Sequence, residues 1–240
     1  MSAAALLVVL PLLAGATVQR STGLGLALVG APFVVAILGP RDGVSFGNAL
    51  QIVLCALVLS RTWRGTDGRA VVLLLLGAAV GVPLGALLVL TVPEAPLLVV
   101  VGTLAALGVA LSVFPAAGRM LVGTPGAIGA GAAAGFVNAT AGVGGPLVSA
   151  YALARRIPPE RFVPTAQAVL LVINAVALSA KGLPDLGADV WLAGLVAIAV
   201  GSALGGPVAR RLSPTLTRRL VLVIALAGAL ATVVRGLVEL

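Results

Sequence analysis

Residues 126–154 read GAIGAGAAAGFVNATAGVGGPLVSAYALA, an apolar stretch with a glycine-rich segment in its second half. A helix rises about 1.5 Å per residue and the hydrocarbon core of a bilayer is about 30 Å thick, so one crossing takes about 20 residues. The stretch is too long for one crossing and too short for two. Divided at Asn138–Pro146, it predicts two short helices that meet inside a membrane. Their free backbone groups then need protein, water or a solute as partners.

The composition of the 240 residues identifies an integral membrane protein. Hydrophobic residues make up 60% and charged residues 9%, with a mean hydropathy of +1.22, whereas a soluble domain carries about 25% charged residues. The net charge of +8 comes from basic residues in short loops, which is the positive-inside pattern of membrane proteins. We therefore expect the lipid bilayer as a partner and no nucleic acid.

The residue types present argue against an enzyme. The chain has no histidine, and its one cysteine, Cys55, excludes an internal disulfide and a cysteine metal cluster. All the acidic residues lie at or near the ends of apolar segments: Asp42, Asp67, Glu94, Glu160, Asp185, Asp189 and Glu239. We expect no catalytic residue, no metal, no cofactor and no buried carboxylate that carries a proton across the membrane.

The order of apolar segments predicts an internal duplication. Three spans are expected in each half, at 44–60, 70–91 and 96–115 and again at 163–180, 189–209 and 217–238. Shifting the sequence by 120 residues places Gly81, Gly85 and Gly108 on Gly201, Gly205 and Gly228. The segment GAPFVVA at 30–36 also resembles GGPLVSA at 144–150. We expect a single membrane domain over 1–240, built from a first repeat at 1–118 and a second at 124–240.

The basic loops predict how the two repeats lie in the membrane. Loops 61–69, 155–161 and 210–219 are rich in arginine, whereas 92–95 and 181–189 are not. If residues 126–154 enter and leave from one side, all three arginine-rich loops face the cytoplasm. Each half is then a hairpin plus three spans, so the second half is inverted and both termini lie outside. Residues 2–38 form either two full spans or a re-entrant hairpin, and both options keep the inversion.

The fold class predicted from these patterns is therefore an all-α integral membrane protein. It consists of an inverted repeat of two halves, each with a broken helix or hairpin plus three transmembrane helices. Gly131 and Gly135, and the series Gly77, Gly81 and Gly85, are expected to let helices pack closely.

The break at 138–146 is the predicted substrate site. Proline suits the first turn of a helix, so Pro146 is expected to open the returning helix after a glycine turn. The backbone N–H groups at that helix start attract an anion, and nearby amide and hydroxyl groups add neutral hydrogen bonds. The residues predicted to bind substrate here are Asn138, Thr140, Gly142, Gly144, Gly145 and Pro146.

Polar residues in the next span of each half extend this prediction. They are Ser45, Asn48 and Gln51 in the first half and Thr165, Gln167 and Asn174 in the second. Polar groups inside a membrane face the bundle interior or a cavity, so Thr165 is expected beside the anion and the others along its path. The alternative is ordinary hydrogen bonding between helices. Lys181 and Arg61, at matching segment ends, either attract anions to the vestibules or extend toward the membrane surface.

The segment GVGGPLV at 142–148, followed by RIPPERFVPTA at 156–166, resembles the TauE/SafE sulfite exporter family. Members typically carry a glycine-rich turn with proline in each half, then a short basic loop and a helix with threonine or serine. The first half here keeps Pro32 but lacks the full glycine run. The resemblance implies transport of a small anion, often a sulfur-containing one such as sulfite or a sulfonate.

Together these features predict a secondary transporter in the cell membrane that moves a small anion by alternating access. A passive anion channel and a non-transporting membrane subunit are the alternatives. A second copy of the chain, in a homo-oligomer, stays open as a partner.

Overall fold

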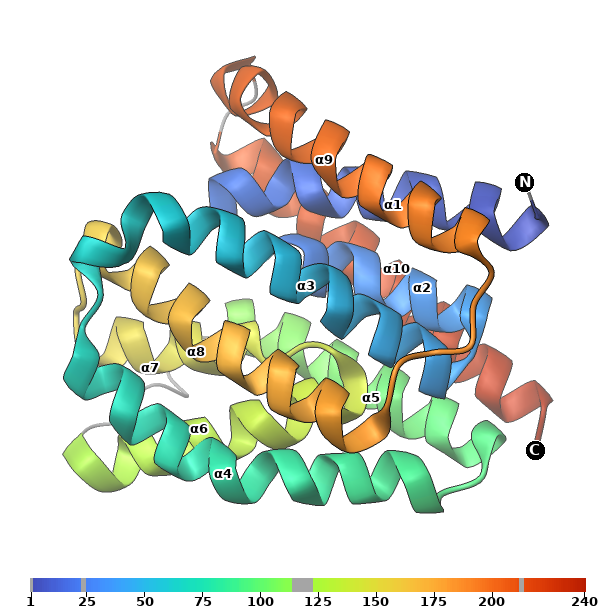
Figure 1. Cartoon of the computed structure of the whole chain (residues 1–240), viewed down its shortest axis with the longest axis horizontal. Coiled ribbons are helices and arrows are strands. Elements are labelled where there is room, and N and C mark those ends of the chain that lie inside the picture. The colour runs from blue at the N-terminus through green and yellow to red at the C-terminus, as the bar shows by residue number, and fades with distance from the viewer. Residues whose placement is uncertain (1, 23–24, 114–122, 212–213) are drawn as a thin grey trace.

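The computed structural model describes residues 2–22, 25–113, 123–211 and 214–240, and this part of the chain is helical, with no β-strand. The first half comprises α1 (Ala3–Thr22), a short π-helix η1 (Leu26–Gly30), α2 (Ala31–Leu38), α3 (Pro40–Thr62), the 3-10 turn η2 (Trp63–Gly65), α4 (Gly68–Thr91) and α5 (Glu94–Val113). The second half comprises α6 (Gly123–Ala141), α7 (Gly145–Ala154), α8 (Pro159–Lys181), α9 (Ala188–Arg211) and α10 (Pro214–Val238). Figure 1 shows these helices lying side by side along the long axis.

Six of the described helices are long and apolar enough to cross a bilayer: α3, α4, α5, α8, α9 and α10. They match the three spans that the sequence predicts for each half. The outward face of α4 exposes Leu76, Val80, Leu84 and Leu87. An exposed row of large apolar side chains is what contact with lipid requires, so the chain is an integral membrane protein.

The stretch at 126–154 forms the predicted hairpin. The helices α6 and α7 are separated by a break at 142–144, and Pro146 lies in the first turn of α7. The returning helix has 10 residues and is therefore only about 15 Å long, too short to cross. The first limb is longer than predicted, because α6 begins at Gly123 and has 19 residues.

Residues 2–38 also form a hairpin with a short returning limb. That limb, Leu26–Leu38, consists of the five residues of η1 and the eight of α2, and 13 residues span only about 20 Å. Of the two options that the sequence left open, the structure has the hairpin with a short return.

The interior of this limb differs from what the resemblance between 30–36 and 144–150 suggests. Gly30 and Ala31 both have helical backbone angles, so Pro32 lies inside a continuous helix and not at a gap. The Ala31 N–H bonds to the carbonyl of Leu26, five residues earlier, which is the wider π-type turn. Such a turn makes room for a proline ring that would clash with a carbonyl in a regular α-helix.

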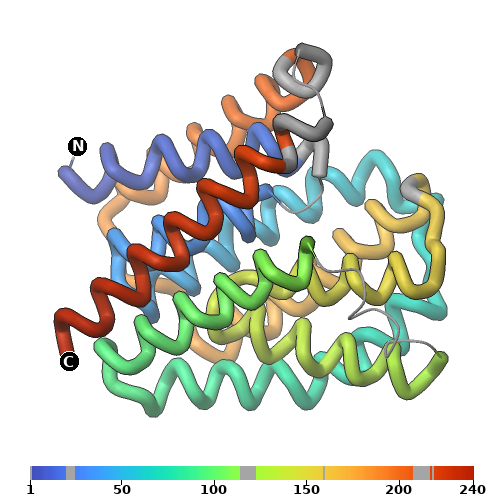
Figure 2. Tube along the Cα trace, turned by 180° about the vertical axis from the view of Figure 1, so that it is seen from behind, coloured from blue at the N-terminus to red at the C-terminus, as the bar shows by residue number. Residues whose placement is uncertain are grey.

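Helices from the two halves pack in pairs: α4 on α6, α1 on α9, α3 on α8, and α5 on α10; Figure 2 shows α5 alongside α10. The contact between α4 and α6 depends on glycine. A Cβ atom at Gly77 or Gly81 would overlap the backbone carbonyl of Ile128 or Ala132, and one at Gly131 would overlap that of Leu74. The prediction that these glycines serve close packing is confirmed.

The connections gather at two ends of the molecule (Figure 1). The links from α3 to α4 and from α7 to α8 lie at one end, together with the end of α9 and the start of α10. The links from α4 to α5 and from α8 to α9 lie at the other end, with both termini. The arginine-rich loops 61–69 and 155–161 therefore share one end, as the charge pattern predicts.

Candidate functional site

Three buried asparagines meet beside the break between α6 and α7. Asn48 on α3, Asn138 on α6 and Asn174 on α8 are each only 1% exposed. The Asn138 side-chain nitrogen donates to Asn174 Oδ1 at 2.9 Å, and Asn174 Nδ2 donates to the Leu170 carbonyl at 2.6 Å. With its amide oriented to suit its neighbours, Asn48 donates from Nδ2 to Asn174 Oδ1 at 3.3 Å. Three helices are thus joined by one chain of amides.

Asn138 also holds the break itself in shape. Its side-chain oxygen accepts a hydrogen bond from the Gly144 N–H at 3.1 Å, and its carbonyl accepts one from the Gly142 N–H at 2.8 Å. Gly142 has φ +72°, a left-handed conformation that glycine adopts without strain. The break is therefore a defined turn, in which one of the N–H groups predicted to face an anion is already bonded to Asn138.

Lys181, the last residue of α8, reaches back to the same place. Its ammonium donates to the Ala139 carbonyl at 2.9 Å and, in the same Asn48 orientation, to Asn48 Oδ1 at 3.2 Å. From the sequence, Lys181 was expected either to attract anions to a vestibule or to extend toward the membrane surface. It was not among the predicted site residues. One signal was present, because Lys181 is the only lysine and the other fourteen basic residues are arginines.

Two of the predicted site residues lie apart from this cluster. Thr140 is buried, but its hydroxyl faces the Gly85 carbonyl on α4 at 3.5 Å. The hydroxyl of Thr165 accepts a hydrogen bond from the Asp67 N–H at 2.9 Å. Thr165 therefore lies near the start of α4, about 13 Å along α8 from Asn174.

The remaining predicted residues are all buried, on α3, α7 and α8: Ser45, Gln51, Gly145, Pro146 and Gln167. Gln51 lies three residues after Asn48, on the same face of α3. Its side-chain oxygen is buried and has no hydrogen-bond partner in the part of the chain that the structure describes. An unpaired buried acceptor costs about 1–3 kcal/mol, so Gln51 carries unused hydrogen-bonding capacity next to the cluster.

A small cavity lies between the first hairpin, α3 and the break. Its lining comes from Leu12, Leu26, Ala27, Ala31 and Val34, from Gly43, Val44, Gly47 and Gln51, and from Gly142. Its volume is about 10 Å³, which is room for about one water molecule. Gln51 and Gly142 place polar groups on its wall.

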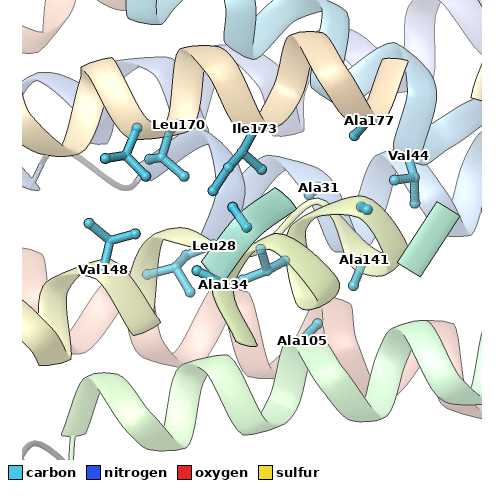
Figure 3. Packing of buried hydrophobic residues seen from close by; sticks show 14 of the residues in the cluster. Leu28, Ala31, Val44, Ala105, Ala134, Ala141, Val148, Leu170, Ile173 and Ala177 are labelled. Carbon is cyan, nitrogen blue, oxygen red and sulfur yellow. The ribbon is translucent and has the colours of Figure 1, made fainter. Parts of the chain in front are cut away.

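Apolar side chains enclose the break on several sides. Figure 3 shows Ala31, Val44, Ala141 and Ala177, from α2, α3, α6 and α8, around the turn. Such surroundings have a low dielectric constant, which strengthens hydrogen bonds and charge interactions inside them. The hydrogen-bond donors gathered beside the break are amide N–H groups and one ammonium.

The family comparison agrees with this architecture. The family model of the sulfite exporter TauE/SafE matches residues 7–232. The chain therefore belongs to the sulfite exporter TauE/SafE family, as the GVGGPLV segment suggests, and is a multi-pass membrane protein of a transporter family. Neither a curated protein nor a solved structure matches it.

Proposed function

We propose that the chain is a secondary transporter that carries a small sulfur-containing anion, such as sulfite or a sulfonate, across the cell membrane. The observation that carries the proposal is the convergence of three buried asparagines on a backbone break inside a helical membrane protein. Amide N–H groups and an ammonium are donors, and an oxyanion presents only acceptors. Family membership supports the sulfur chemistry of the substrate.

The proposed mechanism is alternating access between two inverted repeats. Helix α4 packs on the second hairpin through α6, and α9 packs on the first hairpin through α1. A Cβ placed on Gly108 of α5 would lie 3.6 Å from Pro146, and one on Gly228 of α10 would lie 3.0 Å from Pro32. These exchanged contacts support two related halves. In such a pair, each half can take the conformation of the other, which opens the site first to one side and then to the other.

The proposed binding residues are Asn48, Asn138 and Asn174 with the turn formed by Gly142, Gly144, Gly145 and Pro146. Ser45, Gln51 and Gln167 are proposed to line the path. Thr140 and Thr165 make helix contacts in the conformation described, so a part in binding would require the halves to move.

Uptake into proteoliposomes tests the proposal. Sulfite, sulfate, methanesulfonate and a carboxylate of similar size are offered to the purified full-length chain. We expect saturable uptake of a sulfur oxyanion, accelerated by the same anion preloaded inside the vesicles. Flux that does not saturate and shows no such counterflow would identify a channel. The absence of flux with every anion would favour a non-transporting subunit.

Two variants on the same helix connect transport to the site. Asn174→Leu breaks the amide network and is expected to lower uptake by about tenfold or more, since losing a hydrogen bond and exposing its partners costs about 1–3 kcal/mol. Ser179→Ala is the matched control, because this exposed hydroxyl bonds to the carbonyl of Ala175 one turn earlier in its own helix. Equal uptake by both variants would remove the asparagine cluster from the proposed site.

A further inference from the structure

Lys181 occupies an unusual place for a charged side chain. It is the last residue of α8, and the link from α8 to α9 lies at the end of the molecule away from the arginine-rich loops (Figure 1). Its side chain is nevertheless partly buried and donates to the Ala139 carbonyl, close to the break. Both of its hydrogen-bond partners, the Ala139 carbonyl and the Asn48 side-chain oxygen, are neutral. The ammonium thus connects the carbonyl end of α6 to the asparagine cluster.

No carboxylate balances this charge within the described part of the chain. The ion pair found there joins Arg235 to Glu239, at 2.7 Å. A partly buried charge that has only neutral partners is costly, because it has lost water and gained no opposite charge. A mobile anion would supply the missing charge.

Two other cations show what simple helix capping looks like. Arg41 donates to the carbonyls of Val89 and Val92 at the end of α4. Arg235 donates to the Ala36 carbonyl near the end of α2 and pairs with Glu239. Both stabilise helix C-termini, where a positive charge is favourable. Lys181 caps α6 in the same way, but it alone of the three also bonds to an asparagine of the buried cluster.

We propose that Lys181 recognises the charge of the transported anion. Two of its three N–H donors are taken by Ala139 and Asn48, and the third is left for an oxyanion held beside Asn48 and the break. This inference rests on the proposed function and adds to it a specificity-determining residue. Lys181 then favours anions by their charge, while the asparagine amides provide neutral hydrogen bonds.

The proposal makes a prediction that depends on anion valence. Coulomb energy scales with the product of the charges. Removing one positive charge therefore costs a dianion twice the free energy that it costs a monoanion. If Lys181→Gln weakens binding of methanesulfonate about tenfold, it should weaken binding of sulfate about 100-fold. A residue that only braces α6 would weaken both anions by the same factor.

The experiment measures half-saturating concentrations of methanesulfonate and sulfate for the full chain in proteoliposomes. We expect Lys181→Gln to show the unequal loss and Lys181→Arg to keep the wild-type ratio of the two anions. Arg41→Gln is the matched control, since it removes a capping cation at the same end, and its ratio should stay unchanged. Equal losses for both anions in Lys181→Gln, or no loss, would overturn the inference while leaving the transporter assignment intact.

A second variant guards against a folding defect in Lys181→Gln. Asn48→Asp keeps the size of the side chain and places a carboxylate against the ammonium, which neutralises Lys181 without removing it, at the loss of the donation from Asn48 to Asn174 Oδ1. It should discriminate against sulfate relative to methanesulfonate as Lys181→Gln does, and an unchanged ratio would contradict the inference. If the wild-type chain takes up neither these anions nor sulfite, the proposed function fails and this inference fails with it.

Discussion

The molecule has two hairpins, the first formed by α1 with η1 and α2 and the second by α6 with α7. In both, an amide side chain of the first limb accepts a hydrogen bond from a backbone N–H at the start of the returning limb, but the returning limbs begin differently. In the first, the Gln19 side-chain oxygen accepts a hydrogen bond from the Leu26 N–H at 2.9 Å. In the second, Asn138 accepts one from the Gly144 N–H at 3.1 Å. The first returning limb is then helical through Pro32, whereas the second begins only after a break of three residues.

The two hairpins also differ in the partner of the side-chain nitrogen of this amide. Asn138 Nδ2 donates to Asn174 on α8, whereas Gln19 Nε2 is buried without a partner among the described residues. In the shift by 120 residues, the position of Asn174 corresponds to Leu54, which is apolar. The comparison teaches that two hairpins of similar shape need not share chemistry. The amide network and Lys181 are bonded to the second hairpin, through Asn138 and the Ala139 carbonyl, whereas the first hairpin contributes apolar packing beside it.

The largest effect is expected where each hairpin packs against a span. Gly81→Leu should reduce the yield of folded protein about tenfold or more, because overpacking a close helix contact costs several kcal/mol. Gly201→Leu tests the equivalent contact of α9 with the first hairpin, where a Cβ would lie 2.6 Å from the Leu13 carbonyl. Size-exclusion chromatography of a fluorescent fusion measures the yield.

The control for this pair is Gly129→Leu, on the exposed face of α6 with no atom within 4 Å of an added Cβ. It should fold as the wild type does. Normal yields of Gly81→Leu would mean that α4 and α6 are not in close contact.

A smaller effect is expected from adding one methyl group inside each hairpin. In Gly144→Ala the new Cβ would lie 2.7 Å from the Ala134 carbonyl, whereas in Gly30→Ala it would lie 3.2 Å from a flexible Leu26 methyl. We expect Gly144→Ala to lower the free energy of unfolding by about 1–3 kcal/mol and Gly30→Ala to lower it less. Thermal unfolding in detergent compares the two, and the reverse order would contradict the assignment of the tighter turn to the second hairpin.

The next pair of variants removes the amide side chain that bonds to the start of the returning limb of each hairpin, Asn138 in the second and Gln19 in the first. Asn138→Ala should reduce uptake about tenfold, because it frees Gly144 and cuts the link to Asn174, each worth about 1 kcal/mol or more. Gln19→Ala frees only the Leu26 N–H and should reduce uptake by less than about threefold. Initial uptake rates at equal protein density measure both. Similar losses would mean that the first hairpin takes part in binding as fully as the second.

The smallest effect on stability is expected from Gln51→Leu. Removing an unpaired buried oxygen should leave the unfolding temperature unchanged or raised, because no hydrogen bond is lost. If Gln51 lines the path, uptake should nevertheless fall. A lower unfolding temperature would show that Gln51 has a structural partner, and unchanged uptake would place the path elsewhere.

Much of the fold follows from local sequence properties. The six spans could be predicted because hydropathy over about 20 residues determines whether a helix can cross a membrane. The break before Pro146 could be predicted because glycine and proline act on their own backbone. Pro32 shows the limit of this reasoning. The same residue type leaves a helix unbroken when a π-type turn precedes it, and the resemblance between 30–36 and 144–150 contains no sign of that turn.

The candidate site was predicted in part. The polar residues of α3 and α8 were correctly expected to be buried, since polar groups in a membrane avoid lipid. Periodicity specifies which face of its own helix a residue occupies, but not which neighbour that face meets. Thr165 was therefore grouped with the break, although its hydroxyl bonds to Asp67 near the start of α4.

By itself, the sequence determined the membrane class, the six long apolar spans, the family and the position of the second break, because each depends on properties of contiguous residues. Only the tertiary structure decided that Asn48, Asn138 and Asn174 form one network and that Lys181 turns inward to join it. These residues come from three separate helices, and their meeting depends on how those helices pack. The close approach of backbones at Gly77, Gly81 and Gly131 is part of that packing, and its geometry emerges only when the whole chain is folded.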